Sequence, residues 1–148
     1  MSLPQNIQNY DELDFHVISE DYTRYRLDDR TVLKIKLSVQ KMFLLEPISS
    51  QQIPNIGFAA INLVNAIVPK ELKKFGRDQI PIDNANIADK IGLELIEEIW
   101  QEYHTMNGYR IRIRPVITQV SKYKKYNNFG EPVYSVPNIQ QITDVEKL

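Results

Sequence analysis

Basic residues at alternate positions are the side chains of this chain best suited to binding chemistry. Alternate residues of a strand lie on one face, and arginine or lysine on a sheet can hold phosphate groups while a nearby aromatic ring stacks on a base. The candidates for ligand or nucleic-acid binding are Lys34, Lys36, Arg110, Arg112, Arg114, Lys122, Lys124 and Tyr123. The same pattern also keeps the outer face of a sheet soluble, and the net charge of −1 gives no overall attraction for nucleic acid.

Acidic residues form a second group of candidates. Paired carboxylates can hydrolyse glycosides or bind hard cations, but solvated strand faces and turn corners also carry such residues. Glu20 and Glu98 stand out because they occupy matching places of an apparent internal repeat. A hydrolase using acids at the interface of two repeated units is therefore a third hypothesis, although we expect the more ordinary pairing of each acid with a basic neighbour.

The sequence gives no positive signal for metal binding, cysteine chemistry or a phosphate-binding loop. The two histidines, His16 and His104, do not match under the repeat, and a metal site would need further ligands and a fold that brings them together. The chain has no cysteine, and its five glycines are too far apart for a phosphate-binding loop. We therefore expect no catalytic residue, no metal and no cofactor.

The apparent repeat aligns the stretch 14–39 with the stretch 92–117. Tyr22 falls on Trp100 and Tyr25 on Tyr103, while Lys34 and Lys36 fall on Arg112 and Arg114. Matched aromatic residues at hairpin positions favour core or cross-strand packing. The repeat predicts two equivalent hairpins with their basic residues on equivalent faces.

Alternating apolar residues and turn signals place these side chains on strands. We expect a hairpin over 22–45 around residues 28–30, a second over 100–117 around 106–108, and a third from 116 to 145 around 127–132. The apolar run 58–68 predicts a buried strand, and proline before glycine predicts a short helix over 69–76.

Residues 85–104 fit two structures. Ile87, Ile91, Leu95, Ile99 and Tyr103 recur every four residues, which favours an amphipathic helix, whereas the repeat maps the second part of this segment onto a strand. We expect a short helix over 84–91 and a strand from Leu93, because the hairpin that follows is strongly indicated.

The predicted organisation is a flexible N-terminal arm (1–12), a first β unit (13–76), a linker with a short helix (77–92) and a second β unit (93–148), both units in one compact domain. The fold class is mainly β, a sandwich or partly closed barrel with one or two short helices near the middle. No apolar run is long enough to span a bilayer and no signal peptide is visible, so we expect no membrane association and a cytoplasmic location.

The function that this pattern favours is that of a non-catalytic binding or assembly module. Its expected partner is a second copy of the chain or another protein. Nucleic-acid binding through the basic sheet face is the alternative.

Overall fold

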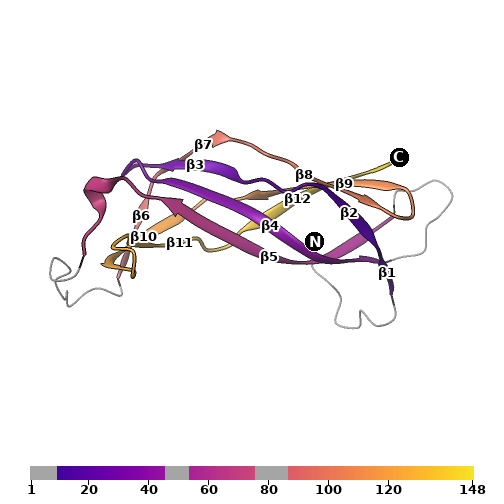
Figure 1. Ribbon diagram of the computed structural model, residues 1–148, viewed down its shortest axis with the longest axis horizontal. Coiled ribbons are helices and arrows are strands. Elements are labelled where there is room, and N and C mark those ends of the chain that lie inside the picture. Colours follow the sequence, from indigo (N-terminus) through magenta and orange to yellow (C-terminus); the bar gives the residue numbers. More distant parts are fainter. Residues whose placement is uncertain (1–9, 46–53, 76–86) are drawn as a thin grey trace.

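The computed structural model describes residues 10–45, 54–75 and 87–148, and they form a mainly β protein of elongated shape (Figure 1). The first half contains β1 (Asp11–Leu13), β2 (Phe15–Ser19), β3 (Thr23–Leu27), β4 (Val32–Leu44), β5 (Ile56–Ile67) and the 3-10 turn η2 (Lys70–Leu72). The second half contains β6 (Ala88–Ile91), β7 (Leu93–Glu97), β8 (Gln101–Thr105), β9 (Tyr109–Val116), β10 (Val120–Tyr126), β11 (Pro132–Ser135) and β12 (Gln140–Lys147).

The strands form three antiparallel sheets that pack as a sandwich. Sheet A has the order β1-β4-β3-β7, with β5 on the other side of β4; sheet B has the order β12-β9-β8-β2, and sheet C the order β11-β10-β6. One core cluster joins Leu37 and Phe58 of sheet A to Ile113 of sheet B, and a second joins Ile35 of sheet A to Val120 of sheet C. Sheet A is thus one layer, and sheets B and C form the facing layer.

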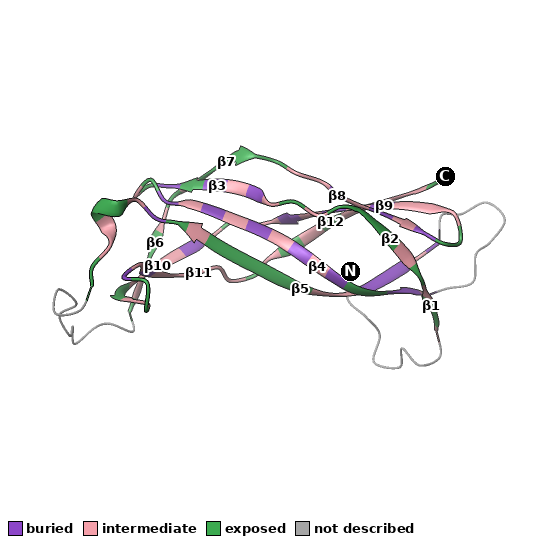
Figure 2. Cartoon of the chain, in the orientation of Figure 1, coloured by how far each residue is buried: buried purple, intermediate pink, exposed green. Residues whose placement is uncertain are grey.

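The long strand β4 has the alternation that the sequence predicts. Leu33, Ile35 and Leu37 are buried, whereas Lys34 and Lys36 lie between them on the outer face. Figure 2 shows this alternation along β4 and the exposed stretch of its neighbour β5. Burial of the apolar side fixes the register, because a slip of one residue would turn every lysine inward.

Strand pairing recurs between the two halves in the alignment of the apparent repeat. Tyr25 pairs with Leu33 in the β3–β4 hairpin, and Tyr103 pairs with Ile111 in the β8–β9 hairpin. Likewise β1 pairs with the end of β4, where Leu13 lies opposite Met42, as β6 pairs with β10. The equivalent hairpins are present; their origin by duplication stays a prediction.

The halves also exchange strands. β2 of the first half pairs with β8 of the second, with Phe15 opposite Thr105, and β7 of the second half pairs with β3 of the first, with Leu93 opposite Leu27. The alignment of the repeat places β2 on β7 and β3 on β8, so these two pairings are equivalent. Each half therefore supplies an outer strand to the hairpin of the other.

Three details differ from the expectation. Residues 88–91 are strand β6 rather than the end of a helix, because the pairing with β10 overrides the four-residue apolar period. Asp11 and Glu12 belong to β1 rather than to a free arm. The expected strand 133–145 is interrupted between β11 and β12, where Pro137 lies and Asn138 has a φ of 56°, so β12 turns away and pairs with β9.

The two helix predictions are only partly covered by the structure. Within 69–76, Lys70–Leu72 forms a single 3-10 turn, and Gly76 lies outside the described residues. Most of the 77–92 linker lies outside them as well.

Candidate functional site

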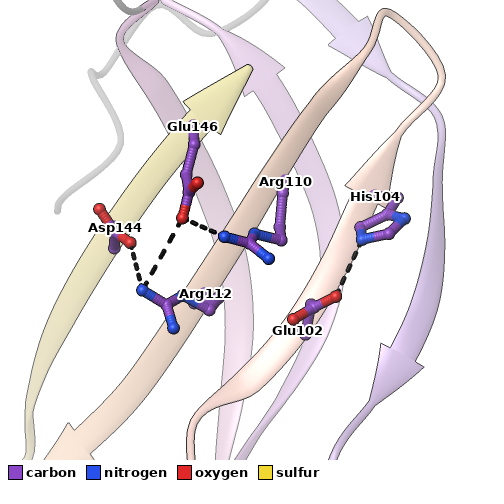
Figure 3. Close-up of polar contacts among 6 residues, drawn as sticks. All are labelled: Glu102, His104, Arg110, Arg112, Asp144 and Glu146. Carbon is purple, nitrogen blue, oxygen red and sulfur yellow. Dashed lines mark hydrogen bonds and ion pairs between the residues drawn. The ribbon is translucent and has the colours of Figure 1, made fainter. Parts of the chain in front are cut away.

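The arginines of β9 lie on the outer face of sheet B, where Arg110 and Arg112 form a ladder of charges with the acids of β12 (Figure 3). Arg110 is hydrogen-bonded to Glu146, and Arg112 donates to Asp144 over 2.7 Å. Arg114 Nε lies 3.4 Å from a carboxylate oxygen of Glu98. The hydrogen bond from Arg110 to Glu146 raises the pKa of Arg110 despite some desolvation. The three arginines are thus neutralised within the sheet, which weakens them as phosphate ligands.

One of the two aromatic pairs that the repeat matches, Tyr22 and Trp100, lies beneath the basic residues in both halves. The guanidinium groups of Arg112 and Arg114 lie 5.4 and 5.3 Å from the ring of Trp100. Lys34 and Lys36 lie 4.7 and 4.9 Å from the ring of the equivalent Tyr22. The repeat predicted that the basic residues lie on equivalent faces of the two halves. Each of these faces carries a cluster of two cations over one aromatic ring.

The two clusters differ in their acidic neighbours. Asn65 lies opposite Lys34 in β5, whereas Asp144 lies opposite Arg112 in β12. Among the described residues, neither Lys34 nor Lys36 forms an ion pair. The outer face of sheet A, in the first half, therefore keeps its positive charge, whereas acids neutralise the positive charge on the outer face of sheet B.

Glu20 and Glu98 have unlike surroundings despite their matching positions. Glu20 accepts hydrogen bonds from the Tyr103 hydroxyl over 2.6 Å and from the backbone N–H of Val39 over 3.2 Å. Burial, followed by the bond to Glu20, raises the pKa of Tyr103. Glu20 therefore secures a buried tyrosine, while Glu98 pairs with Arg114, and both acids have structural partners.

Tyr103 also binds Gln101, a buried polar residue that sequence analysis did not single out. The Gln101 side-chain amide accepts from the backbone N–H of Leu37 and donates to its carbonyl, over 2.8 and 2.7 Å, and donates to the Tyr103 hydroxyl. The equivalent Tyr25 instead accepts a long 3.4 Å bond from the N–H of Ile117. These bonds join the two layers of the sandwich.

The fold brings the two histidines together, which the sequence could not indicate. His16 lies directly opposite His104 in the β2–β8 pairing, and a carboxylate oxygen of Glu102 lies 2.9 Å from His104 Nε2. Within the described residues, however, no three His, Cys, Asp or Glu side chains are grouped so that they could hold a metal ion. The pair lies on the strand face beside the arginine ladder.

A half-buried acid in the β3–β4 turn, Asp29, is the centre of a polar cluster, and sequence analysis had placed it only among turn acids. Asp29 accepts from Lys122 Nζ over 2.9 Å, from the Tyr134 hydroxyl over 2.5 Å and from the backbone N–H of Thr31 over 3.0 Å. Burial acts to raise the pKa of Asp29, but these hydrogen bonds together outweigh it and lower that pKa. Burial and the bond to Asp29 raise the pKa of Tyr134.

The candidate residues of β10 line a hollow between β6 and β10. Lys122, Tyr123 and Lys124 all contribute to a cavity of about 340 Å³, and Tyr126 lies on the same strand. The structure therefore separates the candidate residues into three places: the outer face of sheet A, the outer face of sheet B, and this cavity in sheet C.

Strand β5 differs most from its sequence-based prediction. The run 58–68 was expected to be buried because it is apolar, but residues 61–65 are exposed and Ile67 is 55% exposed. Among the described residues β5 pairs with β4 alone, so its other edge is open. The available signal was the lack of any charge along all 12 residues, which is unusual for an open edge.

Comparison with protein-family models, curated proteins and solved structures found no match, so function is inferred from the geometry of this chain. In the part of the chain that is described, no helix has the length and hydropathy needed to cross a membrane.

Proposed function

We propose that this protein is a non-catalytic assembly module that pairs with a second copy of itself through the open edge of β5. The observation that carries this proposal is a 12-residue edge strand with no charge, no proline and exposed apolar side chains. Unpaired N–H and C=O groups on such an edge are a template for another strand.

The other edges are protected in ways that β5 is not. β1, β6, β7 and β12 each contain acidic residues, and β11 begins with Pro132. β2, which has neither, is only five residues long. Charges, proline and short length are the usual means by which a sheet edge avoids association. Their absence from β5, the longest open edge described, supports a role for that edge in pairing.

A second copy of the chain suits this edge because two copies of β5 can pair with each other. Antiparallel pairing about a twofold axis would bring the middle of β5, around Leu63 and Val64, against the same residues of the partner without placing like charges in contact. The lysines of β4 would lie three strand spacings from their copies, about 14 Å. That separation exceeds the screening length of about 8 Å at physiological ionic strength, so their repulsion is small.

A hollow beside β5 adds contact area for the partner. It has a volume of about 310 Å³ and lies between the inner side of β5 and the β10–β11 hairpin, with Val64, Ala66, Phe129 and Tyr134 among its lining residues. Phe129 is exposed as well. Apolar side chains near the edge would be removed from water when a second sheet extends across it.

Nucleic-acid binding and hydrolase activity, the other two hypotheses, have less support. For nucleic acid, the favourable feature is Lys34 and Lys36 above Tyr22, but the three arginines are already ion-paired. For a hydrolase, Glu20 and Glu98 both have structural partners. The assembly role is therefore the function we place first.

The proposed assembly is tested by adding a charge to the open edge. Leu63→Lys and Val64→Lys replace side chains that are 37% and 45% exposed, so the monomer should keep its fold while a self-paired edge would hold like charges in contact. We expect the unmodified protein to form dimers at micromolar concentrations in light scattering and sedimentation, and both variants to shift to monomers.

Ile142→Lys is the matched control, because Ile142 is 44% exposed and lies in β12, opposite Arg114 as Leu63 lies opposite Lys36. It should leave the dimer unchanged. A protein that remains monomeric at high concentration, or a dimer that is disrupted by Ile142→Lys and not by Leu63→Lys, would contradict pairing through β5.

A further inference from the structure

The cavity in sheet C has a composition that packing alone does not explain. It has a volume of about 340 Å³, within the range of small-molecule sites. Its polar and aromatic lining comes from β6 and β10 and comprises Asp89, Lys90, Lys122, Tyr123, Lys124 and Tyr126.

The equivalent place in the first half has apolar side chains on its longer strand. β1 pairs with the end of β4 in the register in which β6 pairs with β10, so Leu44 corresponds to Lys122 and Leu45 to Tyr123. Met42, Phe43 and Leu45 are buried there. A lysine and a tyrosine of the cavity therefore stand where the first half has two leucines, and Lys90 stands where it has Glu12. The counterparts of Lys124 and Tyr126 lie outside the described residues.

The lysines of the cavity are not all neutralised. Lys122 is held by Asp29 over 2.9 Å and lies opposite Asp89 in the pairing. Lys90 and Lys124 form no ion pair with any other described residue. The lining thus has an excess of positive charge, with Lys122 fixed in position and two lysines available to an anion.

The tyrosines supply apolar surface at the same place. Lys125 lies 5.1 Å from the ring centroid of Tyr123, and Lys74 lies 5.6 Å from that of Tyr126. A cation on one face of a ring orients it and leaves the edge and the other face for contact with an apolar group. Two rings beside available ammonium groups suit a ligand with one anionic end and one apolar end.

We propose that this cavity binds a small organic anion, a phosphate or carboxylate attached to a body about the size of one ring. Lys90 and Lys124 bind the anionic group, and Tyr123 and Tyr126 contact the body. The site is independent of the β5 edge and goes beyond the assembly role.

The test is a titration of the full chain with three probes, followed by calorimetry and by amide chemical shifts. Phenyl phosphate carries both the anion and the ring, inorganic phosphate carries only the anion, and benzyl alcohol carries only the ring. We expect phenyl phosphate to bind most tightly, to shift amides of β6 and β10, and to bind more weakly as salt is raised.

Lys90→Gln combined with Lys124→Gln should weaken phenyl phosphate binding about tenfold or more, since two charge-assisted contacts are lost. Lys34→Gln is the control, a lysine without an ion pair among the described residues and outside the cavity, and it should change nothing. The variant Leu63→Lys should also retain binding, so the outcome is separate from that of the assembly test.

Three results would overturn the proposal. They are no binding of phenyl phosphate at millimolar concentrations, equal binding of benzyl alcohol, and an equal loss of affinity with Lys34→Gln. The cavity lysines would then be an ordinary solvated group.

Discussion

Arg30 and Gly108 occupy equivalent places in the β3–β4 and β8–β9 turns, and both have a positive φ, of 72° and 95°. In each turn the N–H of this residue donates to a carbonyl three residues earlier, Leu27 or Thr105. Glycine adopts this left-handed conformation freely, whereas a residue with a Cβ is strained there by about 1 kcal/mol. The first turn is therefore the less favourable of two turns with the same geometry.

Arg30→Gly should raise the free energy of unfolding by about 0.5–1 kcal/mol, because relief of strain exceeds the added entropy of the unfolded chain. Gly108→Ala should lower it by about 1 kcal/mol through backbone strain alone, since an added Cβ would meet no atom within 4 Å. Urea denaturation measures both changes. Destabilisation by Arg30→Gly would indicate that the arginine side chain contributes more than its conformation costs.

At the scale of elements, Asp29 connects the β3–β4 turn of sheet A to β10 and β11 of sheet C. Its partners Lys122 and Tyr134 come from those two strands. The net effect of its surroundings is a pKa below the ordinary 3.8. A carboxyl whose pKa is lower in the folded protein stabilises the fold above its unfolded pKa of about 3.9, and this stabilisation is lost as the pH falls through the folded value.

Asp29→Asn should therefore lower the free energy of unfolding by about 1–3 kcal/mol at neutral pH, since a half-buried charged acceptor of three hydrogen bonds is lost. The gap between the unmodified protein and the variant should narrow as the pH falls from about 5 to 3, because the aspartate becomes protonated. Denaturation at a series of pH values measures this gap. A gap that stays constant over that range would mean that the charge of Asp29 does not stabilise the fold.

Strand positions were the most predictable feature, because the buried face of a strand leaves a period of two in the sequence. The hairpins about residues 28–30 and 106–108 were located correctly, and they place Arg24 opposite Lys34 and Glu102 opposite Arg112. The pairing of β6 could not be predicted, since its partner β10 is distant in the sequence and local periodicity suggested a helix.

The candidate sites were less predictable than the strands for a related reason. Alternation placed Arg110, Arg112 and Arg114 on one face, but the acids that neutralise Arg110 and Arg112 come from β12, whose position depends on a break after β11. The exposure of β5 was missed because an apolar strand suggests burial whether its edge is covered or open. The neutralisation of the arginines and the exposure of β5 both depend on which strands become neighbours. The residue pattern of a single strand does not contain that information.

At the scale of the whole molecule, the exchanged strands β2 and β7 imply that the two halves unfold together. Each core cluster also draws side chains from both halves, as Leu37 with Ile113 and Ile35 with Val120 illustrate. Neither half has a hydrophobic core of its own among the described residues. Cooperative unfolding of small domains has this origin, a core that cannot be divided.

Ile35→Ala in the first half should lower the free energy of unfolding by about 2–5 kcal/mol, because Ile35 is fully buried. The fluorescence of Trp100, the single tryptophan and a residue of the second half, should report the same shift in midpoint as circular dichroism. Ile113→Ala, the equivalent change in the second half, should behave alike. Two separate transitions, with Trp100 insensitive to Ile35→Ala, would show that the halves are independent.

The exchange of β2 and β7 has a further consequence for any dimer of this chain. Every pairing between the halves is satisfied equally well when the two halves belong to different molecules, so the contacts of the monomer also define an intertwined, domain-swapped dimer. Such a dimer would keep β5 unpaired and would survive Leu63→Lys. It would also exchange subunits only as fast as the halves unfold. Subunit exchange measured with labelled protein therefore separates slow intertwining from the rapid, reversible joining of two complete molecules along β5.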